Sequence, residues 1–141
     1  MKWWVTCAVV LGAVSVWAQV PPAKVALETY DDCSRAMKEI AAQNGALRKG
    51  LASPSEADAS AAAARLEVVF KDVQAYWEDK KVEDAAKVAR NAVAAAQAVS
   101  KAVAAHDTAA ATAASQALGA TCMTCHTAHR ERLTFDFYRI K

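Results

Sequence analysis

Apolar residues recur every three or four positions along much of this 141-residue chain, and that spacing marks one face of an α-helix. Alanine is abundant, and proline, which breaks helices, occurs only at positions 21, 22 and 54. The first regular stretch has one polar member and consists of Tyr30, Cys33, Met37, Ile40, Asn44, Leu47 and Leu51. The pattern therefore predicts a largely helical chain whose first helix follows the proline pair and ends near Leu51.

Three more helices are predicted after Pro54. Their expected ranges are about 55 to 80, 83 to 105 and 108 to 133, with Asp107 as the N-cap of the last helix. The turns between them are short, so successive helices should run antiparallel. We predict an all-α fold, an antiparallel up-down-up-down four-helix bundle. The aromatic tail at 135–141 is predicted to be extended and to fold back over the end where the fourth helix ends.

The first 18 residues have the composition of an export signal. Lys2 supplies a positive start, the run from Trp3 to Trp17 is uncharged and mostly apolar, and Ala18 ends a stretch suited to cleavage. We predict a signal peptide at 1–18, a mature domain at 19–141 and a bacterial-type periplasmic location. An uncleaved membrane anchor is the alternative, although the apolar run is short for a spanning helix.

The charge of the mature chain is close to neutral. The full chain has 17 Lys and Arg against 15 Asp and Glu, and loss of Lys2 with the signal leaves a net charge of +1 with neutral histidines. Such a balance provides no argument for binding to nucleic acid or to an anionic membrane surface. We therefore expect no nucleic-acid partner and no stable membrane insertion after signal cleavage.

The run Cys122-Met123-Thr124-Cys125-His126 predicts the chemistry of the chain. In an exported protein, Cys-x-x-Cys-His is typical of c-type haem attachment, because two thiols about one turn apart can bond the two vinyl groups while the imidazole faces the iron. A redox Cys pair would need a β-α-β context, and a zinc site would need a second ligand pair; neither pattern is present. We predict one covalent haem c on Cys122 and Cys125, near the C-terminal end of the fourth helix, with His126 as the fifth iron ligand.

The sixth iron ligand is approached by elimination. The mature chain has two methionines, and Met123 lies between the haem cysteines, so it cannot reach the opposite face of the ring. At 1.5 Å per residue from the shared bundle end, Met37 lies roughly 20 Å and His126 roughly 28 Å along the axis, and their side chains lean toward each other. Cys33 and Tyr30 lie at similar heights, so height alone does not exclude them as the sixth ligand. Met37 is the expected sixth ligand; the alternative is a core-filling methionine above a five-coordinate iron.

A four-helix chain with this motif inside its last helix resembles the class II cytochromes c, the cytochrome c prime group. The resemblance covers the architecture of the whole mature chain, but residue-level matches are confined to the haem motif with Arg130 and to Met37-Lys38 in the first helix. It implies a low-spin iron with a methionine ligand at the position of Met37. In the gas-binding members of the group, a bulky residue at that position shields an open iron face.

The resemblance also bears on residues around the ring. It implies that Arg130 lies beside the proximal imidazole, where it could hold a propionate or tune the ligand. It implies that His129 replaces an aromatic residue of the group as a proximal packing or hydrogen-bonding residue. A basic residue that often stands four positions before the ligand methionine is replaced here by Cys33, so Arg35 is the substitute candidate for a propionate contact.

The function expected from these features is that of a periplasmic mono-haem cytochrome that carries one electron between redox partner proteins. The alternative is a five-coordinate binder of nitric oxide or carbon monoxide. An enzyme is not expected, because no distal acid-base constellation is apparent on the first two helices. Homodimer formation is left open. Cys33 should be a single buried thiol, and His106 an exposed residue in the turn at the far end of the bundle.

Overall fold

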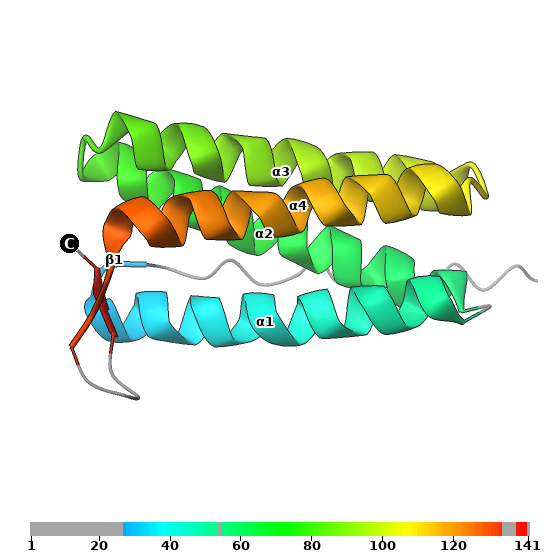
Figure 1. Cartoon of the computed structure of the whole chain (residues 1–141), viewed down its shortest axis with the longest axis horizontal. Coiled ribbons are helices and arrows are strands. Elements are labelled where there is room, and N and C mark those ends of the chain that lie inside the picture. Colours follow the sequence, from blue (N-terminus) through cyan, green and yellow to red (C-terminus); the bar gives the residue numbers. More distant parts are fainter. Residues whose placement is uncertain (1–26, 54, 134–137, 141) are drawn as a thin grey trace, which may run out of the picture.

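The computed structural model describes residues 27–53, 55–133 and 138–140, so the predicted signal peptide and most of the aromatic tail lie outside the described residues. Its elements are α1 (Tyr30–Ala52), α2 (Glu56–Asp79), α3 (Glu83–Ala104), α4 (Thr108–His129), β1 (Arg130–Arg132) and β2 (Tyr138–Ile140). The four helices run alternately up and down and pack side by side (Figure 1). The predicted all-α four-helix bundle is confirmed.

Local capping explains where two of the helices begin. The Thr29 hydroxyl accepts a hydrogen bond from the Asp32 backbone N–H at 3.2 Å, and the Asp32 carboxylate accepts from the Thr29 N–H at 2.8 Å, which together form a capping box for α1. The Asp107 carboxylate accepts from the Ala110 N–H at 2.9 Å and starts α4, as expected. Both starts therefore depend on residues close in sequence.

The core of the bundle is formed mainly by α2 and α3 with the inner faces of α1 and α4. Its largest fully buried side chains are Leu47, Leu66, Val69, Val99 and Leu118. On α3 the buried face is mostly alanine and valine, which lets the neighbouring helices approach closely. Gly50 of α1 is buried against α2. The two helices are so close here that a Cβ at this position would lie 2.7 Å from the Ala59 backbone nitrogen. Within the described ranges, no helix is both long and apolar enough to cross a bilayer.

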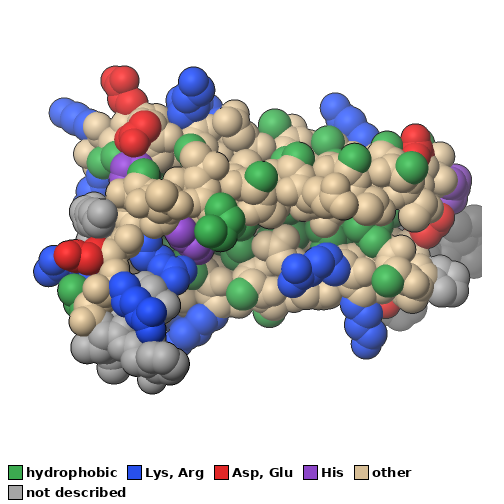
Figure 2. Space-filling model, in the orientation of Figure 1, with side chains coloured by type: hydrophobic (Ala, Val, Ile, Leu, Met, Phe, Trp, Pro, Cys, Tyr) green, Lys and Arg blue, Asp and Glu red, His purple; other side chains and the backbone are tan. Residues whose placement is uncertain are grey.

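The packing of α1 is uneven. This helix lies along α2 over much of its length, whereas it approaches α4 at few points. The space-filling view shows the result as a hollow between α1 and α4, with hydrophobic side chains visible inside it (Figure 2). The seam between the first and last helices is therefore the place where the bundle can accept a ligand.

The predicted end of α4 is wrong by about one turn. The helix ends at His129, and Arg130, with φ −114° and ψ 126°, is already extended. Arg130 to Arg132 then pair antiparallel with Tyr138 to Ile140. Leu133, which was included in the predicted range of the fourth helix, is 52% exposed. The reason is that a strand from later in the chain takes the backbone hydrogen bonds that would have continued the helix. The extended conformation of Tyr138 to Ile140 agrees with the prediction for the tail.

Candidate functional site

A cavity of about 450 Å³ opens between α1 and α4 and reaches down to α2 and α3. Its walls are mainly apolar and include Ile40, Phe70, Val73, Ala89 and Ala92. Among the described residues, no Asp or Glu lines it, whereas two arginines and one histidine do. Its volume lies within the range of roughly 300–1,000 Å³ that is common for cofactor pockets. The cavity therefore suits a largely apolar ligand that carries negative groups.

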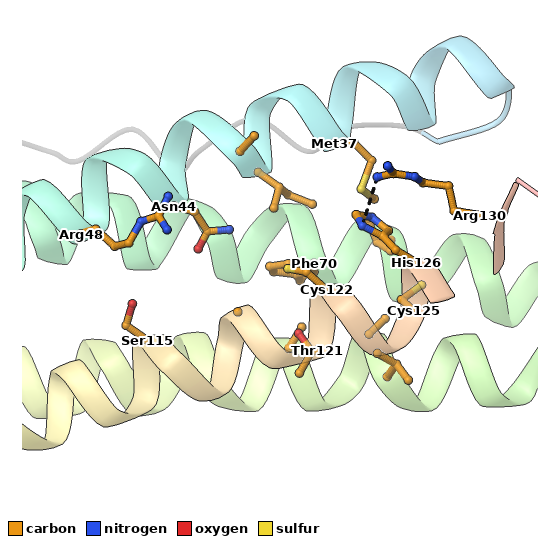
Figure 3. A pocket seen from close by; sticks show the side chains of 17 residues that line it. Met37, Asn44, Arg48, Phe70, Ser115, Thr121, Cys122, Cys125, His126 and Arg130 are labelled. Carbon is orange, nitrogen blue, oxygen red and sulfur yellow. Dashed lines mark hydrogen bonds between the residues drawn. The ribbon is translucent and has the colours of Figure 1, made fainter. Parts of the chain in front are cut away.

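The three chemically important residues of the Cys-x-x-Cys-His run line this cavity. Cys122 and Cys125 lie about one turn apart on α4, both half-buried, and His126 follows directly (Figure 3). The Cys122 thiol donates a long hydrogen bond of 3.7 Å to the Leu118 carbonyl. Burial raises the pKa of both thiols. Two thiols and one imidazole are thus presented together to one apolar space.

The imidazole of His126 has a defined electrostatic environment. Arg130 lies one turn further along the chain, and its Nη1 is 3.3 Å from His126 Nδ1 (Figure 3). Burial, and next the positive charge of Arg130, lower the pKa of His126 below its ordinary value. The ring is therefore neutral at neutral pH, which is the form that can bind a metal.

Met37 reaches into the same cavity from the opposite side. It lies on α1, and in Figure 3 its thioether points toward His126 on α4. The other two residues at its height do not line the cavity. Cys33 is 4% exposed, and burial raises the pKa of its thiol; Tyr30 is 51% exposed. Met37 is thus the one of the three that faces the imidazole.

The residues expected around the proximal side are only partly brought together. Arg130 lines the cavity, but His129 does not. The His129 Nε2 lies 2.9 Å from Asp84 Oδ2, and its ring packs on Trp77 with the ring centroids 5.4 Å apart. Three residues along a helix rotate a side chain by roughly 60° from the starting face. That rotation directs His129 to α2 and α3 and leaves His126 facing α1.

The other two residues singled out in the sequence lie away from the cavity. Arg35 is exposed and forms an ion pair with Asp32 on its own helix. It is not among the residues that line the cavity, as a propionate contact would be. His106 lies in the turn at the far end of the bundle, where its Nδ1 is 2.8 Å from Glu56 Oε2. Its expected exposure is confirmed.

Arg48 and Ser115 line the cavity, although neither was predicted from the sequence to do so. A signal for Arg48 was present in the first helix. Asn44 was the single polar member of its inward stripe, and Arg48 follows it by four positions, so both continue the face of Met37 and Ile40. Ser115 lies on α4 among alanines, and its sequence context carried no comparable signal.

Comparisons of the chain with protein-family models, with curated proteins and with solved structures found no match. In the described part of the chain, no three side chains of the types His, Cys, Asp and Glu gather as a metal-binding group. The description of the site therefore depends on the side chains that line the cavity. These are two thiols and an imidazole on α4, and a thioether on α1, all of which face one cavity.

Proposed function

We propose that this protein is an exported mono-haem c-type cytochrome that carries single electrons, with Cys122 and Cys125 bonded to the haem and with His126 and Met37 as its axial ligands. When bound, haem iron supplies a one-electron Fe(III)/Fe(II) couple. The proposal assigns this chain to carriers rather than to enzymes.

The observation that carries the proposal is the position of Met37 relative to the haem motif. Met37 and His126 come from helices about ninety residues apart in sequence, yet they line one cavity and point toward each other. A thioether and a neutral imidazole on opposite sides of a haem are the ligand pair of electron-carrying cytochromes, because the soft sulfur favours the reduced metal and raises the potential.

The side chains that line the cavity are suited to bind haem. A porphyrin is a flat apolar ring with two propionates, and the cavity combines apolar walls with Arg48 and Arg130 and, among the described residues, no acidic lining. Ile40, Phe70 and Val73 would exclude water from the ring. Arg130, which also lines the cavity, would pair with a propionate. Lining of this kind fits haem better than it fits a polar substrate.

The cellular setting is part of the proposal. Covalent haem attachment accords with the signal-like sequence at 1–18, which favours a periplasmic location. The expected partners are redox proteins that donate or accept one electron. Pairing of two bundles as a homodimer is compatible with this function.

The deciding experiment is absorption spectroscopy of the purified ferric and ferrous protein together with a haem stain after denaturing electrophoresis. We expect stained protein, low-spin spectra in both states and no uptake of carbon monoxide by the ferrous form. The double variant Cys122→Ala/Cys125→Ala should lose the stain, because each thiol forms one bond to the haem, whereas Cys33→Ala, which alters a thiol outside the cavity, should keep it. High-spin spectra with ready carbon monoxide uptake would favour the gas-binding alternative, and absence of stain in the wild type would refute covalent haem.

A further inference from the structure

Arg48 is a cation without a partner in the part of the chain that the structure describes. The other arginines of that part each interact with at least one other group; they are Arg35, Arg65, Arg90, Arg130, Arg132 and Arg139. No hydrogen bond or ion pair joins Arg48 to any described residue. The side-chain amide of Asn44, one turn earlier on α1, likewise has no described partner. Two groups with strong hydrogen-bonding capacity are thus available side by side (Figure 3).

The space around Arg48 can admit a ligand group. Arg48 lines the cavity described above and also a second hollow of about 380 Å³ further along the α1–α4 seam. Ser115 and Gly119 of α4 line both spaces as well. No described Asp or Glu lines either of them, so the guanidinium has no internal counter-ion at this point of the seam. In Figure 3 the Ser115 side chain projects from α4 toward α1.

The chemistry of these groups selects the kind of ligand. A guanidinium binds a carboxylate through two parallel N–H···O bonds, and the Asn44 amide and the Ser115 hydroxyl can donate further hydrogen bonds. Arg48 is the guanidinium available at this end of the cavity, since Arg130, the other arginine of the cavity, lies beside His126, with its Nη1 3.3 Å from His126 Nδ1. We propose that Arg48 and Asn44, with Ser115 opposite them, form a carboxylate-binding subsite at this end of the cavity.

The carboxylate has two possible sources. One is a haem propionate, in which case the subsite deepens the function proposed above and rests on it. The other is a small free carboxylate that enters along the seam. Two measurements distinguish these sources, and the second does not depend on haem.

The first measurement is the midpoint potential of the holoprotein as a function of pH. A propionate held by Arg48 titrates with a lowered pKa, so Arg48→Gln should move the corresponding inflection to higher pH by about one unit or more. Lys49→Gln is the matched control, because it removes the neighbouring positive charge from a residue that lines neither space. Arg48→Lys should keep only part of the effect, since an ammonium lacks the bidentate geometry.

The second measurement is an NMR titration of the Arg48 Nε–Hε signal with sodium acetate, with sodium chloride as the ionic-strength control. An inflection that moves only in the Arg48 variants identifies a haem propionate. If the inflection of the midpoint potential stays at the same pH in the Arg48 variants, and acetate shifts the Arg48 signal saturably in the wild type but not in Asn44→Ala, the ligand is a free carboxylate. A fixed inflection with no saturable shift would overturn the subsite. If the haem stain were negative, the proposed function would fail, and the acetate titration alone would decide the subsite.

Discussion

Arg130 Nη1 lies 3.3 Å from His126 Nδ1, and the two side chains are separated by one turn at the end of α4. An arginine can only donate hydrogen bonds, so Nδ1 is the acceptor and the proton of the neutral ring is on Nε2. An imidazole that binds iron through Nε2 would carry its proton on Nδ1, where it could no longer accept from Arg130. The contact is therefore sensitive to the proton position of the proposed ligand.

From this contact we predict the effect of Arg130→Gln on the acidity of His126. Removal of the guanidinium should raise the pKa of His126 toward its ordinary value of 6.5, but not fully to it, because burial is the larger cause of its lowering. The measurement is an NMR pH titration of the ring in a Cys122→Ala/Cys125→Ala background, which carries no covalent haem. Arg35→Gln, which alters an exposed arginine outside the cavity, is the control and should leave the titration unchanged.

Met37→Ala should convert a six-coordinate iron into a high-spin, five-coordinate one. The variant should lose the weak sulfur-to-iron band at the red end of the ferric spectrum, bind carbon monoxide when reduced and have a lower potential, because the thioether stabilises the reduced metal. Met123→Ala is the matched control, since Met123 is 66% exposed and does not line the cavity. Identical spectra for the wild type and Met37→Ala would reduce Met37 to a packing residue.

Two glycines of α1 should respond to alanine in opposite ways. A Cβ at Gly50 would meet the backbone nitrogen of Ala59 at 2.7 Å, so Gly50→Ala should force α1 and α2 apart and lower the free energy of unfolding by about 1–3 kcal/mol. A Cβ at Gly45 would meet nothing within 4 Å. Gly45→Ala should therefore stabilise the protein by about 0.5–1 kcal/mol through helix propensity. Thermal or urea unfolding of both variants tests the pair, and equal effects would contradict the close contact.

The ion pair between His106 and Glu56 should make stability depend on pH. Hydrogen bonding to Glu56, and then its charge, raise the pKa of His106 above 6.5. Because the folded-state pKa is the higher one, the pair stabilises the fold fully below the unfolded-state value and loses this contribution as pH rises through the folded-state value. Glu56→Gln should therefore lower the melting temperature more at pH 6 than at pH 8. In a His106→Gln background, Glu56→Gln should change the melting temperature by the same amount at pH 6 and at pH 8.

The elements that the sequence predicted well are those whose limits depend on nearby residues. The capping interaction of Asp107 involves a residue three positions away, and Pro54 separates α1 from α2. The Cys-x-x-Cys-His spacing likewise acts within two turns of one helix, so its residues were certain to lie together. The height of Met37 followed from the up-and-down order of the helices and the constant rise per residue.

What the sequence determined by itself is therefore the helical elements, their order and the cluster of two thiols and an imidazole on α4. Only the tertiary structure decided that α4 ends at His129, that His129 turns to Asp84, and that Ser115 joins the cavity. The physical reason is that the partners in these contacts belong to other elements of the chain. Asp84 lies 45 positions from His129, and Ile140, which pairs with Arg130 at the end of α4, lies ten positions beyond it and outside the helix. Such contacts depend on how whole helices are placed against each other, and no local spacing specifies them.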